Sequence, residues 1–163
     1  SVYILNQKKL NVKLNLYTTL HESILSQQYL DKLNRIIQNS QYRKHISINT
    51  DYLTDEEIIF YLSQANLVVY PYQFSNESSS AAVRHGIASD SPVLVTPSPI
   101  FNDVRSYINS TDGYSVDQIS ESIFKLLKKN DYEEKDCLKQ WKQQHAFGQI
   151  GKRLQGMIRA SLL

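Results

Sequence analysis

Short apolar runs alternate along this chain with longer segments in which apolar residues recur at helical spacing. The first run alternates apolar and polar residues, which predicts a strand with one polar face. The last two runs are apolar throughout, as in strands that are buried on both faces, and Pro71 ends the third run. The predicted strands are 12–17, 45–49, 67–70 and 92–96.

Helical spacing predicts a helix after each of these strands. Thr54 and Glu57 have the spacing of a capping box, and the small residues of 81–88 predict a short helix that begins near Ser78. The last helix carries an apolar stripe, and we expect that stripe to pack against the sheet. The predicted helices are 29–37, 54–65, 78–88, 119–127 and 145–162.

Strands that alternate with helices in this order indicate an α/β fold in which a parallel sheet is covered on both faces. We therefore expect one doubly wound, Rossmann-like domain over 1–163, with the terminal helix at 145–163 packing on it. The segment 1–10 is short for an opening strand plus helix, so we interpret it as the end of a helix whose strand lies upstream. The chain opens with Ser1 rather than Met, which fits a piece of a longer protein.

The composition argues against several classes of protein. Eighteen Lys and Arg against 16 Asp and Glu give a net charge of +2, too small to indicate nucleic-acid binding as the main function. The single cysteine, Cys137, excludes an intrachain disulfide framework and fits a reducing compartment. No segment approaches the roughly 20 apolar residues of a membrane span. We expect a soluble, cytoplasmic domain with a proper core, because 41% of the residues are hydrophobic.

The junction after the strand at 67–70 is the most informative part of the chain. Glu77 and three serines, Ser78, Ser79 and Ser80, stand between this strand and the next helix. Ligands of open parallel sheets bind at the carboxyl ends of strands, and the exposed N–H groups of a helix start favour a phosphate. A carboxylate there suits sugar hydroxyls, which donate to it, whereas it would repel phosphate. Taken alone, Glu77 is better explained as a favourable acidic residue at a helix start.

The order of residues from His45 to about Asn130 resembles the donor-binding, C-terminal half of a GT-B glycosyltransferase, specifically the retaining family GT4. That pattern has a strand ending in Pro, a Glu, a helix of small residues with a second Glu eight positions on, and Gly-x-Pro-Val at the next strand. The segment PSPIF with the Asp after it resembles the loop that follows. The matching positions are Pro71, Glu77, Ala88, Pro92, Val93, 97–101 and Asp103.

The resemblance implies roles for individual residues. Glu77 would contact the donor sugar as the catalytic carboxylate, and the backbone N–H groups of Ser78, Ser79 and Ser80 would hold the diphosphate. His85 stands where the family has the glutamate that grips the ribose, so the ribose contact must differ. Asp90 stands where the family has glycine, and the family's basic pair has no counterpart beyond Lys8 and Lys9, which match by sign only.

Other residues near this junction are candidates for the same site. Arg84 either reaches a phosphate or pairs with a surface acid. Tyr72 either lines a sugar or base pocket together with Tyr70 or simply packs. Thr96 and Pro97 begin the loop after the next strand and complete the donor-binding set implied by the resemblance.

No other motif competes with this interpretation. The four histidines lack metal-ligand spacing, so we expect no bound metal, and the chain has neither a dinucleotide-binding glycine motif nor a P-loop. The basic residues of the last helix indicate either contact with anionic lipid, at a membrane's inner face, or a solvated face; the second is favoured.

We therefore expect a domain that binds a UDP- or GDP-sugar and needs no other cofactor. The full enzyme would transfer a hexose, with retention, to a glycan or lipid-linked acceptor held by a missing N-terminal domain, and this domain alone would be inactive. Two alternatives stay open: a non-catalytic nucleotide-sugar-binding or regulatory module with a decayed ribose site at His85, and a nucleotide-sugar epimerase. An epimerase needs its own acid and base residues, and none stands out.

Overall fold

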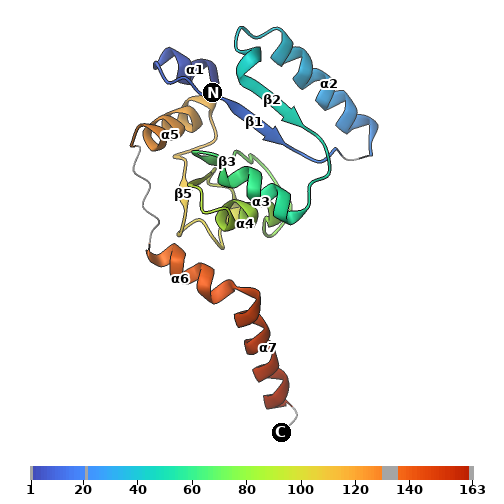
Figure 1. Ribbon diagram of the computed structural model, residues 1–163, viewed down its shortest axis with the longest axis vertical. Helices are drawn as coiled ribbons and strands as arrows, with labels where there is room; N and C mark the ends of the chain where they lie inside the picture. The colour runs from blue at the N-terminus through green and yellow to red at the C-terminus, as the bar shows by residue number, and fades with distance from the viewer. Residues whose placement is uncertain (1, 21, 130–135, 162–163) are drawn as a thin grey trace.

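The computed structural model describes residues 2–20, 22–129 and 136–161. Over these ranges seven α-helices and five strands alternate in a mixed α/β arrangement (Figure 1). The first part comprises α1 (Val2–Gln7), β1 (Leu14–Tyr17), α2 (Ile24–Gln38), the short 3-10 helix η1 (Arg43–His45) and β2 (Ile46–Asn49). β1 and β2 pair in parallel as a two-stranded sheet, with Leu14 opposite Ile46.

The middle of the chain forms a second parallel sheet in the order β3-β4-β5. Val68 of β3 lies opposite Val93 of β4, and Leu94 lies opposite Asn109 of β5. The elements are α3 (Asp55–Ser63), β3 (Val68–Tyr70), α4 (Ala81–Ala88), β4 (Val93–Val95), the 3-10 helix η2 (Pro99–Phe101), β5 (Asn109–Ser110) and α5 (Val116–Lys129).

The side chains of β4 alternate between two cores. Val93 and Val95 belong to a buried cluster with Val83 and Ile87 of α4, whereas Leu94 packs with residues of α1 and α5 on the opposite face. All three β4 side chains are at most 1% exposed. The three-stranded sheet is therefore covered by helices on both faces, as its continuous apolar sequence predicts.

The single doubly wound sheet that we expected is not present in the part of the chain that the structure describes, because the strands there divide into two separate parallel sheets. The expected strands at 12–17, 45–49, 67–70 and 92–96 are all found, each one or two residues shorter than expected, and 1–10 is helical from Val2 to Gln7. The mixed α/β class is thus confirmed, but the strands form two separate sheets where one sheet was expected.

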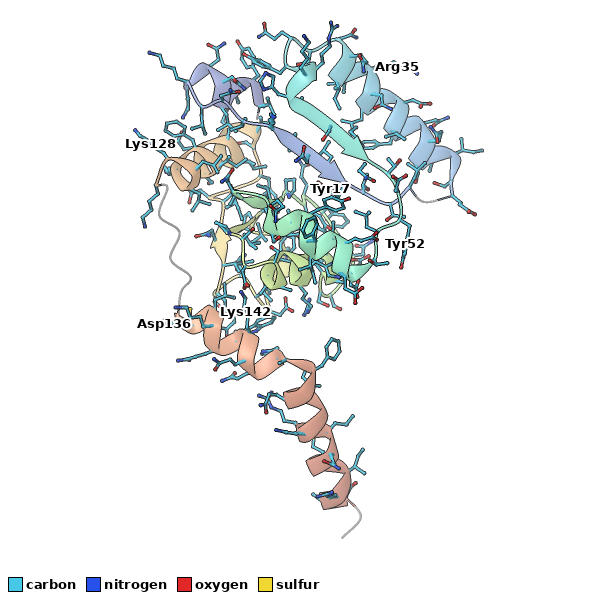
Figure 2. All side chains as sticks on the ribbon, viewed as in Figure 1. Tyr17, Arg35, Tyr52, Lys128, Asp136 and Lys142 are labelled. Carbon is cyan, nitrogen blue, oxygen red and sulfur yellow. The ribbon has the colours of Figure 1, made fainter. Side chains whose placement is uncertain are left out.

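The last two helices behave differently from each other. α6 (Asp136–His145) docks on the body: Leu138 is 3% exposed, and the ring of Trp141 lies 6.1 Å from that of Tyr107. Lys142, labelled in Figure 2, extends this contact with an ion pair of 2.5 Å to Asp90. The sequence pattern did not predict α6.

The apolar stripe of α7 (Phe147–Ser161) does not pack on the sheet, contrary to our expectation for 145–163. Figure 1 shows α7 standing away from the body, and its apolar side chains are 45–95% exposed. The stripe comprises Phe147, Ile150, Leu154, Met157 and Ile158, while Leu162 lies outside the described residues. Among the helices described, none is both long and apolar enough to cross a membrane.

Candidate functional site

Two loops leave the carboxyl ends of neighbouring strands and meet at one edge of the three-stranded sheet. The loop of 71–80 follows β3, and the loop of 96–98 follows β4. The Thr96 hydroxyl donates to the backbone carbonyl of Tyr72, and the Thr96 N–H donates to the Tyr70 carbonyl at 3.3 Å. These bonds hold the two loops together at the edge where ligands of open α/β sheets bind.

The helix that follows the first loop begins later than predicted. α4 starts at Ala81, and Ser80 is its N-cap: the Ser80 hydroxyl accepts from the Val83 N–H at 3.3 Å and the residue is 3% exposed. Ser78 and Ser79 are exposed and precede the cap. Because only the N-cap hydroxyl reaches the free N–H groups of the first turn, one serine of the three caps the helix.

Glu77 lies in this loop, three positions before the N-cap, and is exposed. Its backbone N–H donates to the Ser75 hydroxyl at 3.1 Å, which fixes the chain direction locally. Among the described residues, none forms a hydrogen bond or ion pair with its carboxylate. The carboxylate is therefore available as an acceptor for hydroxyl groups of a ligand.

Arg84 pairs with a surface acid, which is one of the two roles that its position allows. Its guanidinium lies 2.5 Å from the Asp103 carboxylate and donates to the Ser80 carbonyl at 2.6 Å. The two charged side chains are 43% and 39% exposed. The pair links the first turn of α4 to the segment that follows η2, so Arg84 is held beside the loop edge without being buried.

His85 faces α3. Its Nε2 lies 3.1 Å from Oδ1 of Asp55, the first residue of α3, and its side chain is 31% exposed. One imidazole nitrogen is thus occupied by a carboxylate of the protein, which leaves the other for any ligand contact.

The aromatic residues at the end of β3 pack rather than line an open surface. The ring of Tyr72 lies 5.3 Å from that of Phe101, and the hydroxyl of Tyr70 donates to the Ala82 carbonyl at 2.7 Å. Burial raises the pKa of Tyr70 above its ordinary range, so this hydroxyl stays a donor. Of the two roles open to Tyr72, packing is the one that the structure shows.

Thr96 and Pro97 contribute mainly through position. Thr96 is 1% exposed, and its hydroxyl is used by the Tyr72 carbonyl. The carbonyl of Pro97 accepts from the Arg105 guanidinium at 3.1 Å. Both residues therefore use these polar groups in contacts that hold the second loop in place.

Sequence reasoning missed two residues at this edge. Arg105 is half-buried, and no carboxylate among the described residues pairs with it, so it brings an uncompensated positive charge to the second loop. Ser98 is 0% exposed and its hydroxyl has no hydrogen-bond partner within the described part of the chain. No local pattern marks either residue, because their surroundings come from the tertiary fold.

Two surface hollows lie elsewhere. One, of about 350 Å³, is lined mainly by apolar residues of α2 and of the loop before it, and the other lies between α2 and η1. Neither includes a residue of 71–99. Over the described ranges, no three His, Cys, Asp or Glu side chains are grouped so that they would hold a metal ion.

The sequence matches no protein-family model, and a search of curated proteins finds no match. The geometry therefore carries the argument: an unpaired carboxylate, a capped helix start and an uncompensated arginine at the carboxyl edge of a parallel sheet.

Proposed function

We propose that this chain is the donor-binding half of a GT-B glycosyltransferase resembling family GT4, which binds a UDP- or GDP-sugar and transfers its hexose with retention. The acceptor, a glycan or a lipid-linked molecule, would be held by a second domain. The observation that carries the proposal is Glu77: an exposed, unpaired carboxylate in the loop between the carboxyl end of β3 and the N-cap of α4.

The loop supplies groups of both kinds that a nucleotide sugar needs. Glu77 would accept hydrogen bonds from sugar hydroxyls. The backbone N–H groups around Ser78 and Ser79 are in an exposed segment beside the start of α4, where an anion is favoured. Arg105 supports this role, since its charge lies beside the Pro97 carbonyl of the adjacent loop.

The same residues explain why we expect weak binding by this domain alone. Arg84 is already paired with Asp103, and His85 with Asp55, so neither is free to grip a ligand without giving up a contact. The acceptor side of the reaction cleft is also absent from the elements described. We therefore expect donor binding without turnover.

A non-catalytic nucleotide-sugar-binding or regulatory module on the same fold is the second candidate. The contact between His85 and Asp55 favours it, because it replaces a ribose-gripping carboxylate with an internal pair. An epimerase receives no support, since no additional acid and base stand together beside Glu77 in the part of the chain that the structure describes.

Calorimetric titration of the chain with UDP-glucose and GDP-mannose tests the donor site. We expect saturable binding of one of the two sugars, and we expect Glu77→Ala to weaken it at least tenfold, a loss of about 1.4 kcal/mol, because charge-assisted hydrogen bonds to hydroxyls are lost. Glu56→Ala is the matched control: Glu56 is an exposed glutamate in the first turn of α3.

The control should bind as the unmodified chain does. Equal affinity for the Glu77→Ala and Glu56→Ala variants would contradict the assigned role of Glu77. Absence of binding to either sugar would favour a module that no longer binds a donor.

A further inference from the structure

Within the described ranges, each of the two parallel sheets has an edge without a partner strand. β1 pairs with β2, and β3 pairs with β4; among the described residues no strand lies on the other side of β1 or of β3. The Val68 N–H donates to the Pro92 carbonyl and the Tyr70 carbonyl accepts from Thr96, so the backbone groups of Val69 point to the unpaired edge. By the same alternation, the Thr18 N–H bonds to Asn49 of β2, which turns the backbone groups of Tyr17 outward.

On one face, α1 contacts the three-stranded sheet and the segment that leads into β2. Leu5 is 2% exposed in a cluster with Leu94 of β4 and Ile123 of α5. The ring of Tyr3 lies 6.1 Å from that of Tyr42, which precedes β2. Lys8, just after α1, forms an ion pair with Glu121 of α5. This helix is therefore held over the region where the two unpaired edges lie.

On the opposite face, α3 contacts both sheets. The ring of Tyr61 stacks on that of Tyr17 at the end of β1, with centroids 5.4 Å apart. Leu62 and Ala65 pack against the cluster that contains Val68 of β3. The region between the two sheets is thus covered by a helix on each face, as a single continuous sheet would be.

The strands that border this region are less buried than their sequence implies. Leu14, Leu16 and Val69 are only half-buried, whereas the β4 side chains, which have strands on both sides, are at most 1% exposed. Residues of parallel strands are usually buried on both faces. One more strand beside β1 and β3 would remove these side chains and the unpaired backbone groups from water.

We propose that a further strand, parallel to β1 and β3, fits between them, and that it is a strand joined to the N-terminal end of α1. Strand, α1 and β1 would then form one right-handed crossover unit. The order becomes β2, β1, added strand, β3, β4, β5, which is the six-strand order of doubly wound sheets. The strand that fits is short, apolar and rich in β-branched residues, without charge or proline. This inference does not depend on donor binding.

Amide hydrogen exchange, followed by NMR, tests the inference in the chain as it exists and in an extended variant. The variant carries about five residues, Val-Ile-Val-Val-Ile, and a polar loop of about three residues before Ser1. We expect the Val69 and Tyr17 amides to exchange rapidly in the unextended chain and at least about a hundredfold more slowly in the variant. The Leu94 amide, inside β4, is the internal reference and should be slow in both.

A matched extension with proline at its central position should give no protection, because proline cannot complete a ladder. The same apolar segment, added as a free peptide with a lysine at each end, is the second readout should the extended chain fold poorly. Protection of Val69 and Tyr17 by either form supports the inference. Protection already present in the unextended chain, including protection that rises with protein concentration through a second copy, overturns it. Unchanged exchange with both forms of the segment also overturns it.

Discussion

At the residue scale, Gly86 is the position where one added methyl group has the clearest consequence. Gly86 is buried within α4, and a Cβ there would lie 2.8 Å from the Tyr70 hydroxyl oxygen and 2.9 Å from its ring. Tyr70 cannot move away easily, because its hydroxyl donates to the Ala82 carbonyl and its side chain is largely buried. The helix therefore tolerates glycine where alanine has the better intrinsic propensity.

We expect Gly86→Ala to destabilise the protein by about 1–3 kcal/mol, the usual effect of overpacking a core. Urea unfolding followed by circular dichroism measures this loss. Gly151→Ala in α7 is the matched control, because nothing lies within 4 Å of its added Cβ, and it should leave the free energy of unfolding unchanged or slightly raised. A Gly86→Ala variant as stable as the control would contradict the close contact with Tyr70.

Interactions between residues that are close in the sequence could be predicted from the sequence. Thr54 and Glu57 were predicted to form a capping box, and both of its hydrogen bonds are present. Ser80 caps α4 as one of the three serines proposed. Asp90, where the resembled family has glycine, has a φ of 61°, a left-handed conformation that glycine adopts most easily. Partners distant in sequence were not readable: the contacts of His85 with Asp55 and of Arg105 with Pro97 arise only in the fold.

At the element scale, the capping box makes the stability of α3 dependent on pH. The backbone N–H and the hydroxyl of Thr54 both donate to Glu57, and these bonds lower the pKa of its carboxyl below the ordinary range. A lowered pKa in the folded state means that the stabilisation is complete above the pKa of the unfolded chain. It is lost as the pH falls through the lower, folded value.

We therefore expect Glu57→Gln to be less stable than the unmodified protein at neutral pH, with the difference shrinking as the pH falls through that window. Urea unfolding at a series of pH values measures it. Glu56→Gln removes a neighbouring charge of the same first turn, and none of the described residues donates to that side chain. If the Glu57→Gln and Glu56→Gln variants lose stability in parallel at every pH, the capping bond is not the cause.

We expect a leucine-to-alanine substitution to have different effects in the two C-terminal helices. Leu138 of α6 is 3% exposed, so Leu138→Ala should cost about 2–5 kcal/mol through the cavity it creates. Leu154 of α7 is 56% exposed, so Leu154→Ala should leave the melting temperature of the body unchanged. Thermal unfolding of both variants decides this, and a comparable loss in Leu154→Ala would mean that the α7 stripe packs on the body after all.

These helices also show where sequence patterns stop being informative about packing. An apolar stripe at helical spacing identified α7 but does not state which surface covers it. α6 carries few apolar residues, yet Leu138 and Trp141 pack against the buried cluster that contains Val68 and Val93. The positions of the strands could be predicted because each strand is a continuous apolar run in the sequence. Their division into two sheets depends on pairing between residues that are distant in the sequence.

At the scale of the whole molecule, the fold brings two loops to the carboxyl edge of β3 and β4. Glu77 and Ser80 belong to one loop, and Thr96 and Pro97 to the other. A donor bound there would lie beside the proposed added strand, because that strand would be the next neighbour of β3. In doubly wound sheets the strand order reverses between these two strands, and ligands bind at that point. The proposed function concerns the carboxyl end of β3 and the proposed strand concerns its unpaired side, and the two are measured independently.

The location of donor binding tests the central claim most directly. Backbone amide shifts of the isotopically labelled chain, recorded while UDP-glucose or GDP-mannose is added, report even weak binding. The account predicts saturable shifts that are centred on 76–82 and extend to 96–99, and that vanish in the Glu77→Ala variant. Saturable shifts centred instead on the hollow beside α2, or no saturable shifts with either sugar, would contradict it.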